Sequence, residues 1–224
     1  MKRVLCLVAL TVVCAPGRVA GQVLSANAQA PRHQPSAFPD ERASRKWLFF
    51  ASVDTYLVPD DRDYLQPTLI ADRGKLHVEA RYGYEAPDTG SVWLGRNFRG
   101  GRAVAWEFTP MLGGVFGNIN RIAPGYRTAL EWSMLGLFSE GEYVIDPGDS
   151  SESFVYNSSQ LTLAPVDWLR LGLAMQRTRA YDTGLDIQRG FIVELSHGQL
   201  TFAAYVFNLG WTAPTVVLAA GVEF

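Results

Sequence analysis

The stretch Lys75–Glu85 reads KLHVEARYGYE, and its apolar and polar side chains alternate at every second position. Its apolar face carries Leu76, Val78, Ala80, Tyr82 and Tyr84, and its polar face carries Lys75, His77, Glu79, Arg81 and Glu85. A period of two is typical of a β-strand that separates two different surroundings. The stretch therefore predicts a strand with one oily face and one charged face.

The same alternation recurs between Trp47 and Phe224, where we find no convincing helical period of 3.6 residues. Strands of soluble sandwiches commonly run for about five or six residues. The present segments run for about nine to eleven, the length of a tilted strand that crosses a membrane. In lipid every backbone N–H and C=O must be paired, so a sheet of such strands can leave no open edge. The segments therefore predict an all-β fold, a closed antiparallel up-and-down transmembrane β-barrel. An exported soluble sandwich or lipocalin-like barrel is the rival interpretation.

Gly, Pro, Asp and Ser residues divide this region into about 12 expected strands, an even number, as bacterial barrels generally require. These are 47–58, 66–72, 75–85, 91–98, 102–110, 126–136, 141–146, 153–163, 168–178, 187–196, 199–207 and 214–224. Ten strands stay possible, because the pattern is short or out of phase at 66–72, 91–98 and 141–146.

The expected connections alternate in length along the chain. The short ones are 73–74, 99–101, 137–140, 164–167 and 197–198. The longest of the others is 111–125, which is rich in Gly and Asn. Outer-membrane barrels have short periplasmic turns and longer outer loops, so both termini of the chain are expected in the periplasm.

The first 46 residues differ from the rest. Residues 1–21 combine a basic start, a short apolar run and small residues before Gly21, which is the layout of a cleaved signal peptide; Ala28–Ala30 offers a second cleavage site. Residues 22–46 contain three prolines and no apolar period, and we expect a flexible periplasmic segment. The barrel would then cover residues 47–224.

Composition excludes several functions. The two cysteines, Cys6 and Cys14, lie within the expected signal peptide, so the exported chain would have no thiol chemistry. Loss of residues 1–21 would move the formal charge from −2 to about −5. That balance argues against nucleic acid as a partner.

The last strand is apolar at every second position. Its alternating residues are Val216, Leu218, Ala220, Val222 and Phe224. This pattern resembles the closing strand of bacterial outer-membrane β-barrel proteins, whose terminal aromatic residue is associated with recognition by the barrel-assembly machinery. The resemblance implies a Gram-negative outer-membrane location, with membrane lipids and that machinery as partners.

Aromatic residues gather near the expected strand ends and predict two interfacial girdles. The periplasmic girdle would contain Trp47, Trp168 and Phe224, and the outer girdle Tyr82, Tyr84, Tyr126, Phe154, Tyr156 and Trp211. Alternatively, these residues simply mark β-strands.

Eleven ionisable side chains are expected to point into the barrel lumen. They are Asp54, His77, Glu79, Arg81, Glu107, Arg127, Glu131, Glu142, Arg170, Glu194 and Glu223. Such charges either pair across strands and hold the walls or line a water-filled passage. In a passage, the acid excess would favour cations or basic solutes.

Catalytic and metal sites find little support. Among the three histidines only His77 could act in catalysis, with Glu79 two residues away on the same face, but the strand around it carries no serine. We see no acid, His or Cys cluster with metal-ligand spacing, and we expect no cofactor.

Three functional hypotheses remain. The first is a small porin-like channel with a charged lumen that passes a small solute. The second is a structural or surface-interaction barrel with a plugged lumen. The third is an outer-membrane enzyme that hydrolyses lipid or peptide, with His77 as its candidate base.

Overall fold

Each of the twelve expected segments overlaps a strand in the computed structural model, which describes residues 46–59, 62–86, 88–148, 153–180, 186–210 and 214–224. The expected signal peptide and nearly all of the expected flexible segment lie outside the described residues. The strands are β1 (Leu48–Leu57), β2 (Tyr64–Arg73), β3 (Leu76–Tyr82), β4 (Thr89–Arg96), β5 (Phe98–Gly100), β6 (Ala105–Gly117), β7 (Arg121–Trp132), β8 (Leu135–Val144), β9 (Phe154–Val166), β10 (Leu169–Ala180), β11 (Asp186–His197), β12 (Leu200–Phe207) and β13 (Thr215–Glu223).

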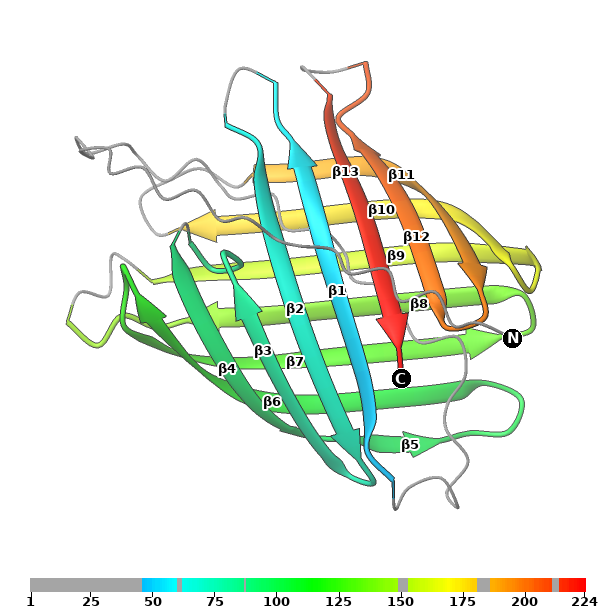
Figure 1. Cartoon of the computed structure of the whole chain (residues 1–224), viewed down its shortest axis with the longest axis horizontal. Coiled ribbons are helices and arrows are strands. Elements are labelled where there is room, and N and C mark those ends of the chain that lie inside the picture. Colours follow the sequence, from blue (N-terminus) through cyan, green and yellow to red (C-terminus); the bar gives the residue numbers. More distant parts are fainter. Residues whose placement is uncertain (1–45, 60–61, 87, 149–152, 181–185, 211–213) are drawn as a thin grey trace, which may run out of the picture.

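The sheet closes on itself. Each strand pairs antiparallel with the next, except that β4 and β5 both pair with β6, and β13 pairs with β1 (Figure 1). At the closing seam Phe49 and Phe224 exchange two backbone hydrogen bonds, each 2.9 Å long. The closed antiparallel barrel of twelve strands is confirmed, with β5 as one extra short strand.

The short strand β5 continues the line of β4 along the edge of β6. Gly95 lies opposite Met111 and Phe98 lies opposite Phe108, so the register is the same on both sides of the break. In this register Arg96 faces Pro110, whose nitrogen carries no hydrogen for the ladder. The proline therefore divides one wall strand into two hydrogen-bonded pieces.

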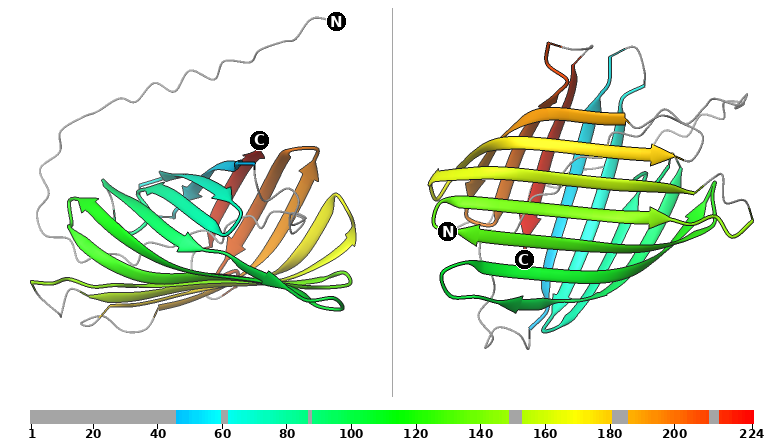
Figure 2. Two further views of the ribbon diagram at one scale, coloured as in Figure 1. Left: turned by 90° about the horizontal axis from the view of Figure 1, so that it is seen from below. Right: turned by 180° about the vertical axis from the view of Figure 1, so that it is seen from behind.

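The barrel has two facing walls. In Figure 1, β13, β1 and β2 form the near wall, and they cross β7–β10 of the far wall at a steep angle. Figure 2 shows the far wall as a broad curved layer with the near wall facing it. Crossing of this kind follows from the strand tilt that barrel closure requires.

The two faces of the wall have inverted polarity compared with a soluble protein. Leu94, Leu112 and Leu173 on the outside are 61%, 58% and 54% exposed. Charged side chains such as Glu79 and Arg81 are buried inside. An outward apolar band with a polar interior is the arrangement of an outer-membrane barrel and argues against a soluble sandwich. Within the described ranges, no helix is long and apolar enough to cross a membrane.

The connections alternate in length as expected, except at the β6–β7 connection. Those at one end of the barrel span residues 74–75, 101–104, 133–134, 167–168 and 198–199. Gly74 and Gly198 have φ angles of 60° and 61°, a conformation that glycine adopts without strain in tight hairpins. Phe224 lies at this end, so the first and last strands meet at the rim that we assign to the periplasm.

The predicted long loop 111–125 is wrong. β6 continues to Gly117 and β7 begins at Arg121, so only residues 118–120 connect them. Glycine suggested a loop, but a Cβ atom at Gly113 would come within 2.5 Å of the Trp93 ring. Gly113 therefore belongs to a strand, where its bare backbone makes room for a buried indole.

The predicted turn at 137–140 is also wrong. The turn comes earlier, at residues 133–134, where Ser133 takes a φ of 55°. β8 therefore starts at Leu135, and Glu140 is part of the strand. Ser133 was a weak local signal, because Ser favours turns less strongly than Gly, Pro, Asn or Asp.

The predicted outer aromatic girdle is wrong for half of its six residues. Tyr84 and Tyr156 are each 1% exposed and lie inside, and Phe154 packs on an interior cluster. Gly83, with a φ of 66°, ends the alternation of β3 before Tyr84. Trp47, Trp168, Phe224 and Tyr82 are exposed, Tyr126 is half-buried, and Trp211 lies outside the described residues.

Two neighbouring glycines give a matched test of β6. Gly113→Ala should destabilise the barrel by about 1–3 kcal/mol, because the added methyl group collides with Trp93. Gly114→Ala should stay within about 0.5 kcal/mol, since nothing lies within 4 Å of its Cβ position. Urea unfolding of the barrel in lipid vesicles measures both. Equal effects would place Gly113 in a loop after all.

A second pair tests the membrane-facing wall. Leu161 is 51% exposed in the middle of β9, and Leu65 is 48% exposed at the outer end of β2. Leu161→Arg should cost about 2–4 kcal/mol of unfolding free energy and Leu65→Arg about 0–1, because the cost of a lipid-facing charge depends on its depth. The same vesicle titration measures both, and a cost independent of position would contradict the membrane orientation.

Candidate functional site: the charged interior of the barrel

The eleven ionisable residues selected from the sequence occupy inward positions of the wall. Seven are buried: Asp54, His77, Glu79, Arg81, Arg127, Glu142 and Glu194. The other four are half-buried: Glu107, Glu131, Arg170 and Glu223. The strand alternation thus brings residues from β1, β3, β6–β8, β10, β11 and β13 to one interior.

Arg81 is the centre of the buried charges. Its Nε donates to Glu79 at 2.8 Å, its Nη1 donates to Glu142 at 2.7 Å, and Glu85 lies 3.7 Å from Nη1. The guanidinium carbon is 4.3 Å and 4.4 Å from the ring centroids of Trp93 and Tyr84. Carboxylates and aromatic faces together replace the water that this cation loses.

The Arg81–Glu142 ion pair crosses the interior. It joins β3 to β8, and in the sheet order β4, β6 and β7 lie between these two strands. Tyr84, just beyond β3, donates in the same direction to Glu140 of β8 at 2.6 Å. Figure 1 shows β3 in the near wall and β8 in the far wall. The two contacts therefore narrow the lumen by bridging its opposite walls.

Arg127 of β7 supplies a second positive charge beside the first. Its Nη1 lies 3.8 Å from Glu79 and its Nε lies 3.9 Å from Glu140. Glu79 therefore has an arginine on each side, from β3 and from β7. We call Glu79, Arg81, Arg127, Glu140 and Glu142 the constriction cluster.

His77 continues the polar contacts from the constriction cluster toward the periplasmic end. Its Nε2 lies 3.3 Å from Glu79, and its Nδ1 lies 2.9 Å from Asp72. Asn97 donates to the same Asp72 at 2.8 Å and accepts from Thr109 at 2.7 Å. His77 is only 1% exposed and held between two carboxylates, which fits a structural role inside the wall.

Nearer the periplasmic rim the charges are partly open to solvent. Arg99 pairs with Glu107, and Arg170 lies 3.2 Å from Glu131 and 3.8 Å from Glu194. The side chains of Glu107 and Glu131 are 26% and 24% exposed. Ion pairs therefore continue from the middle of the barrel to its periplasmic mouth.

The selection from the sequence missed several interior residues. Glu140 was assigned to a turn, Asp72 fell in a strand whose pattern was out of phase, and Tyr84 was placed on an apolar face. Better placement of the 133–134 turn would have found Glu140. No local pattern shows that an arginine and two rings will stack.

One part of the interior is apolar. Tyr56, Ile192, Tyr205, Phe207 and Val217 form a buried cluster from β1 and β11–β13. This apolar cluster and the constriction cluster, which lies on β3, β7 and β8, therefore occupy different strands of the wall. Among the described residues, no group of three or more His, Cys, Asp or Glu side chains could hold a metal ion.

The sequence matches no family model and no curated protein. The structure is similar to that of the KdgM porin, with a TM-score of 0.51 and 9% identity over 78% of this chain and 98% of that chain. The chain has the fold of an outer-membrane β-barrel. A second structure of that porin, described as a complex with disordered oligogalacturonate, matches equally. The outer membrane protein Omp33 of Acinetobacter baumannii matches with a TM-score of 0.46 and 12% identity, over 81% of this chain and 100% of that chain.

The buried pair gives a test of the constriction cluster. Arg81→Met should destabilise the barrel by about 3–5 kcal/mol, because Glu79, Glu85 and Glu142 lose the cation between them. Adding Glu142→Gln should recover part of that loss, since one unpaired carboxylate is removed. Urea unfolding measures the set. Arg96→Met, on the exposed outer wall, is the control and should have little effect.

Proposed function

We propose that this chain is a narrow porin-like channel for small solutes in the bacterial outer membrane, with the constriction cluster as its narrowest region. The observation that carries the proposal is the run of inward ion pairs from Arg81 and Glu142 to Arg170 and Glu131. Charges can also pair to hold the walls of a structural barrel, but here the ion pairs continue to a mouth where Glu107 and Glu131 are partly exposed, as in the lining of a water-filled passage.

Charge supports a preference for cations. Of the eleven selected side chains seven are acids and three are arginines, and Glu140 adds a further buried acid. An oligogalacturonate, which the comparison porin is described as holding, is a chain of sugar acids. The acid excess here would repel such an anion, so the proposed solute is a small cation or a basic molecule.

A second candidate is a structural barrel with a closed interior. It is favoured by the buried apolar cluster around Tyr56, Tyr205 and Phe207, which fills one arc of the lumen with side chains that have no exposed surface. Such packing stabilises the two walls against each other and needs no passage. Neither candidate assigns a catalytic step to His77.

Single-channel recording in planar bilayers separates the two candidates. In a KCl gradient the wild-type protein should show small discrete steps and a reversal potential that indicates cation preference. Replacing Glu107 and Glu131 by Gln should move the reversal potential toward zero, because these acids line the periplasmic mouth. Asp167→Asn, in the exposed turn at 167–168, is the matched control and should change little.

Tyr84→Ala should raise the conductance, since the Tyr84 ring lies against Arg81 and Tyr156 in the narrowest part. No current from any of these variants, with correct folding shown by heat-modifiable migration on gels, would contradict the channel and leave the structural barrel.

A further inference from the structure

On the lipid-facing side of β7–β9, a group of hydrogen-bonded polar side chains lies beside the apolar residues. Asn157 donates to the hydroxyl oxygen of Tyr126 at 2.8 Å and to the backbone carbonyl of Glu140 at 2.9 Å. Ser139 lies 3.2 Å from Tyr126 and 2.9 Å from Ser159. We call Tyr126, Ser139, Asn157 and Ser159 the outer polar group. This group forms a polar surface at the border of the apolar band, near the outer end of the barrel.

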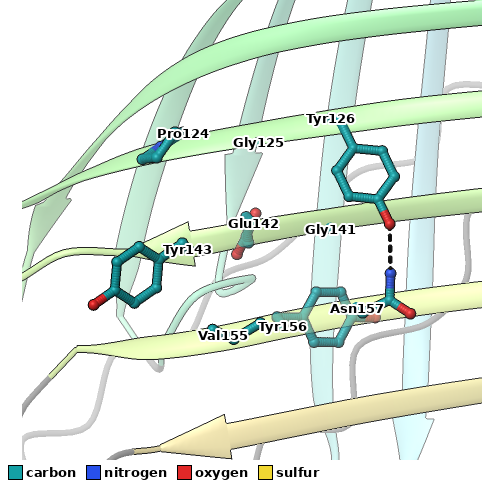
Figure 3. A pocket seen from close by; sticks show the side chains of 9 residues that line it. All are labelled: Pro124, Gly125, Tyr126, Gly141, Glu142, Tyr143, Val155, Tyr156 and Asn157. Carbon is teal, nitrogen blue, oxygen red and sulfur yellow. Dashed lines mark hydrogen bonds between the residues drawn. The ribbon is translucent and has the colours of Figure 1, made fainter.

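A hollow of about 460 Å³ lies beside this group on the outer face of the wall. Figure 3 shows it between the Tyr126–Asn157 pair on one side and Pro124 and Tyr143 on the other. Gly141 forms its floor, where a Cβ atom would come within 2.7 Å of the Tyr126 ring. The hollow is open on the lipid side, and its lining is mostly apolar.

Two arginines extend the polar row toward β11. Arg177 pairs in register with Asn157, and Arg189 pairs with Met175 on the other side of β10. Both are exposed on the same face as Leu173 and Phe191, while the intervening Gln176 and Gly190 are buried. No ion pair of either arginine is found in the part of the chain that the structure describes.

The position of these arginines fits the outer headgroup region. Arg177 lies three residues from the outer end of β10, and Arg189 lies three residues from the outer end of β11. The described outward positions of β7–β11 carry no acidic side chain to pair with them. A second copy of this chain would therefore bring no matching charge on this wall, whereas an anionic lipid would.

We propose that this wall binds one phosphate-bearing anionic lipid of the outer leaflet. Its phosphate would lie between Arg177 and Arg189, and one acyl chain would occupy the hollow beside Tyr126 and Asn157. The arginines supply charge and donors for the phosphate, and the hollow supplies apolar contact for the acyl chain. The site is on the outside of the barrel and is independent of conduction through it.

Native mass spectrometry of the detergent-solubilised full chain tests the site, with phosphatidylglycerol and phosphatidylcholine of identical acyl chains as probes. The wild-type protein should retain one phosphatidylglycerol in preference to phosphatidylcholine. Arg177→Gln with Arg189→Gln should weaken phosphatidylglycerol binding by about tenfold or more. Arg73→Gln with Arg96→Gln removes two exposed arginines at the opposite rim and should leave this lipid in place.

The hollow is tested separately. Val155 is 46% exposed at its edge, so Val155→Trp should fill it, keep the fold and displace the lipid. Leu94→Trp, at a wall position that is 61% exposed and far along the sheet, should not. Equal binding of the two lipids, or equal loss of phosphatidylglycerol in both arginine pairs, would overturn the proposal. A Val155→Cys variant that forms a disulfide-linked dimer without bound lipid would also overturn it, because the wall would then contact a second copy of the chain.

Discussion

Pairing of the first strand with the last is the constraint on which the rest of the structure depends. In hydrocarbon an unpaired edge strand would leave a row of backbone groups without partners, and β13 removes that edge by binding to β1. The bonds between Phe49 and Phe224 complete the ladder at the rim. Once the sheet is closed, the side chains along each strand point alternately to the lipid and to the interior.

Closure also explains the unusual interior. Residues that are far apart in the sequence meet there because the walls face each other, as Arg81 of β3 and Glu142 of β8 do. The charges in the middle of the barrel are buried, so they pair with one another, and Arg81 also stacks on Trp93 and Tyr84 where the lumen is narrowed. The same packing that stabilises the walls against each other thus defines the proposed constriction.

Two glycines serve the two faces of the wall in the same way. On the inside, Gly113 leaves room for the Trp93 indole next to Arg81. On the outside, Gly141 leaves room for the Tyr126 ring that borders the hollow. In both cases the missing side chain of a glycine lets an aromatic ring lie against the backbone of a strand. The charged constriction cluster lies beside the Trp93 ring, and the apolar hollow lies beside the Tyr126 ring.

The sequence by itself determined the barrel, its twelve wall strands and the inward side of residues such as Glu79, Arg81 and Glu142, because period-two alternation is a local property of the chain. It misplaced the turn before Leu135 and took the strand around Gly113 for a loop, since both depend on packing against distant residues. Only the tertiary structure decided which charges pair, that Tyr84 turns inward, and that Tyr126, Asn157 and Arg177 share one row of the outer wall. The reason is that strand register and wall-to-wall distance arise from closure, which no single segment encodes.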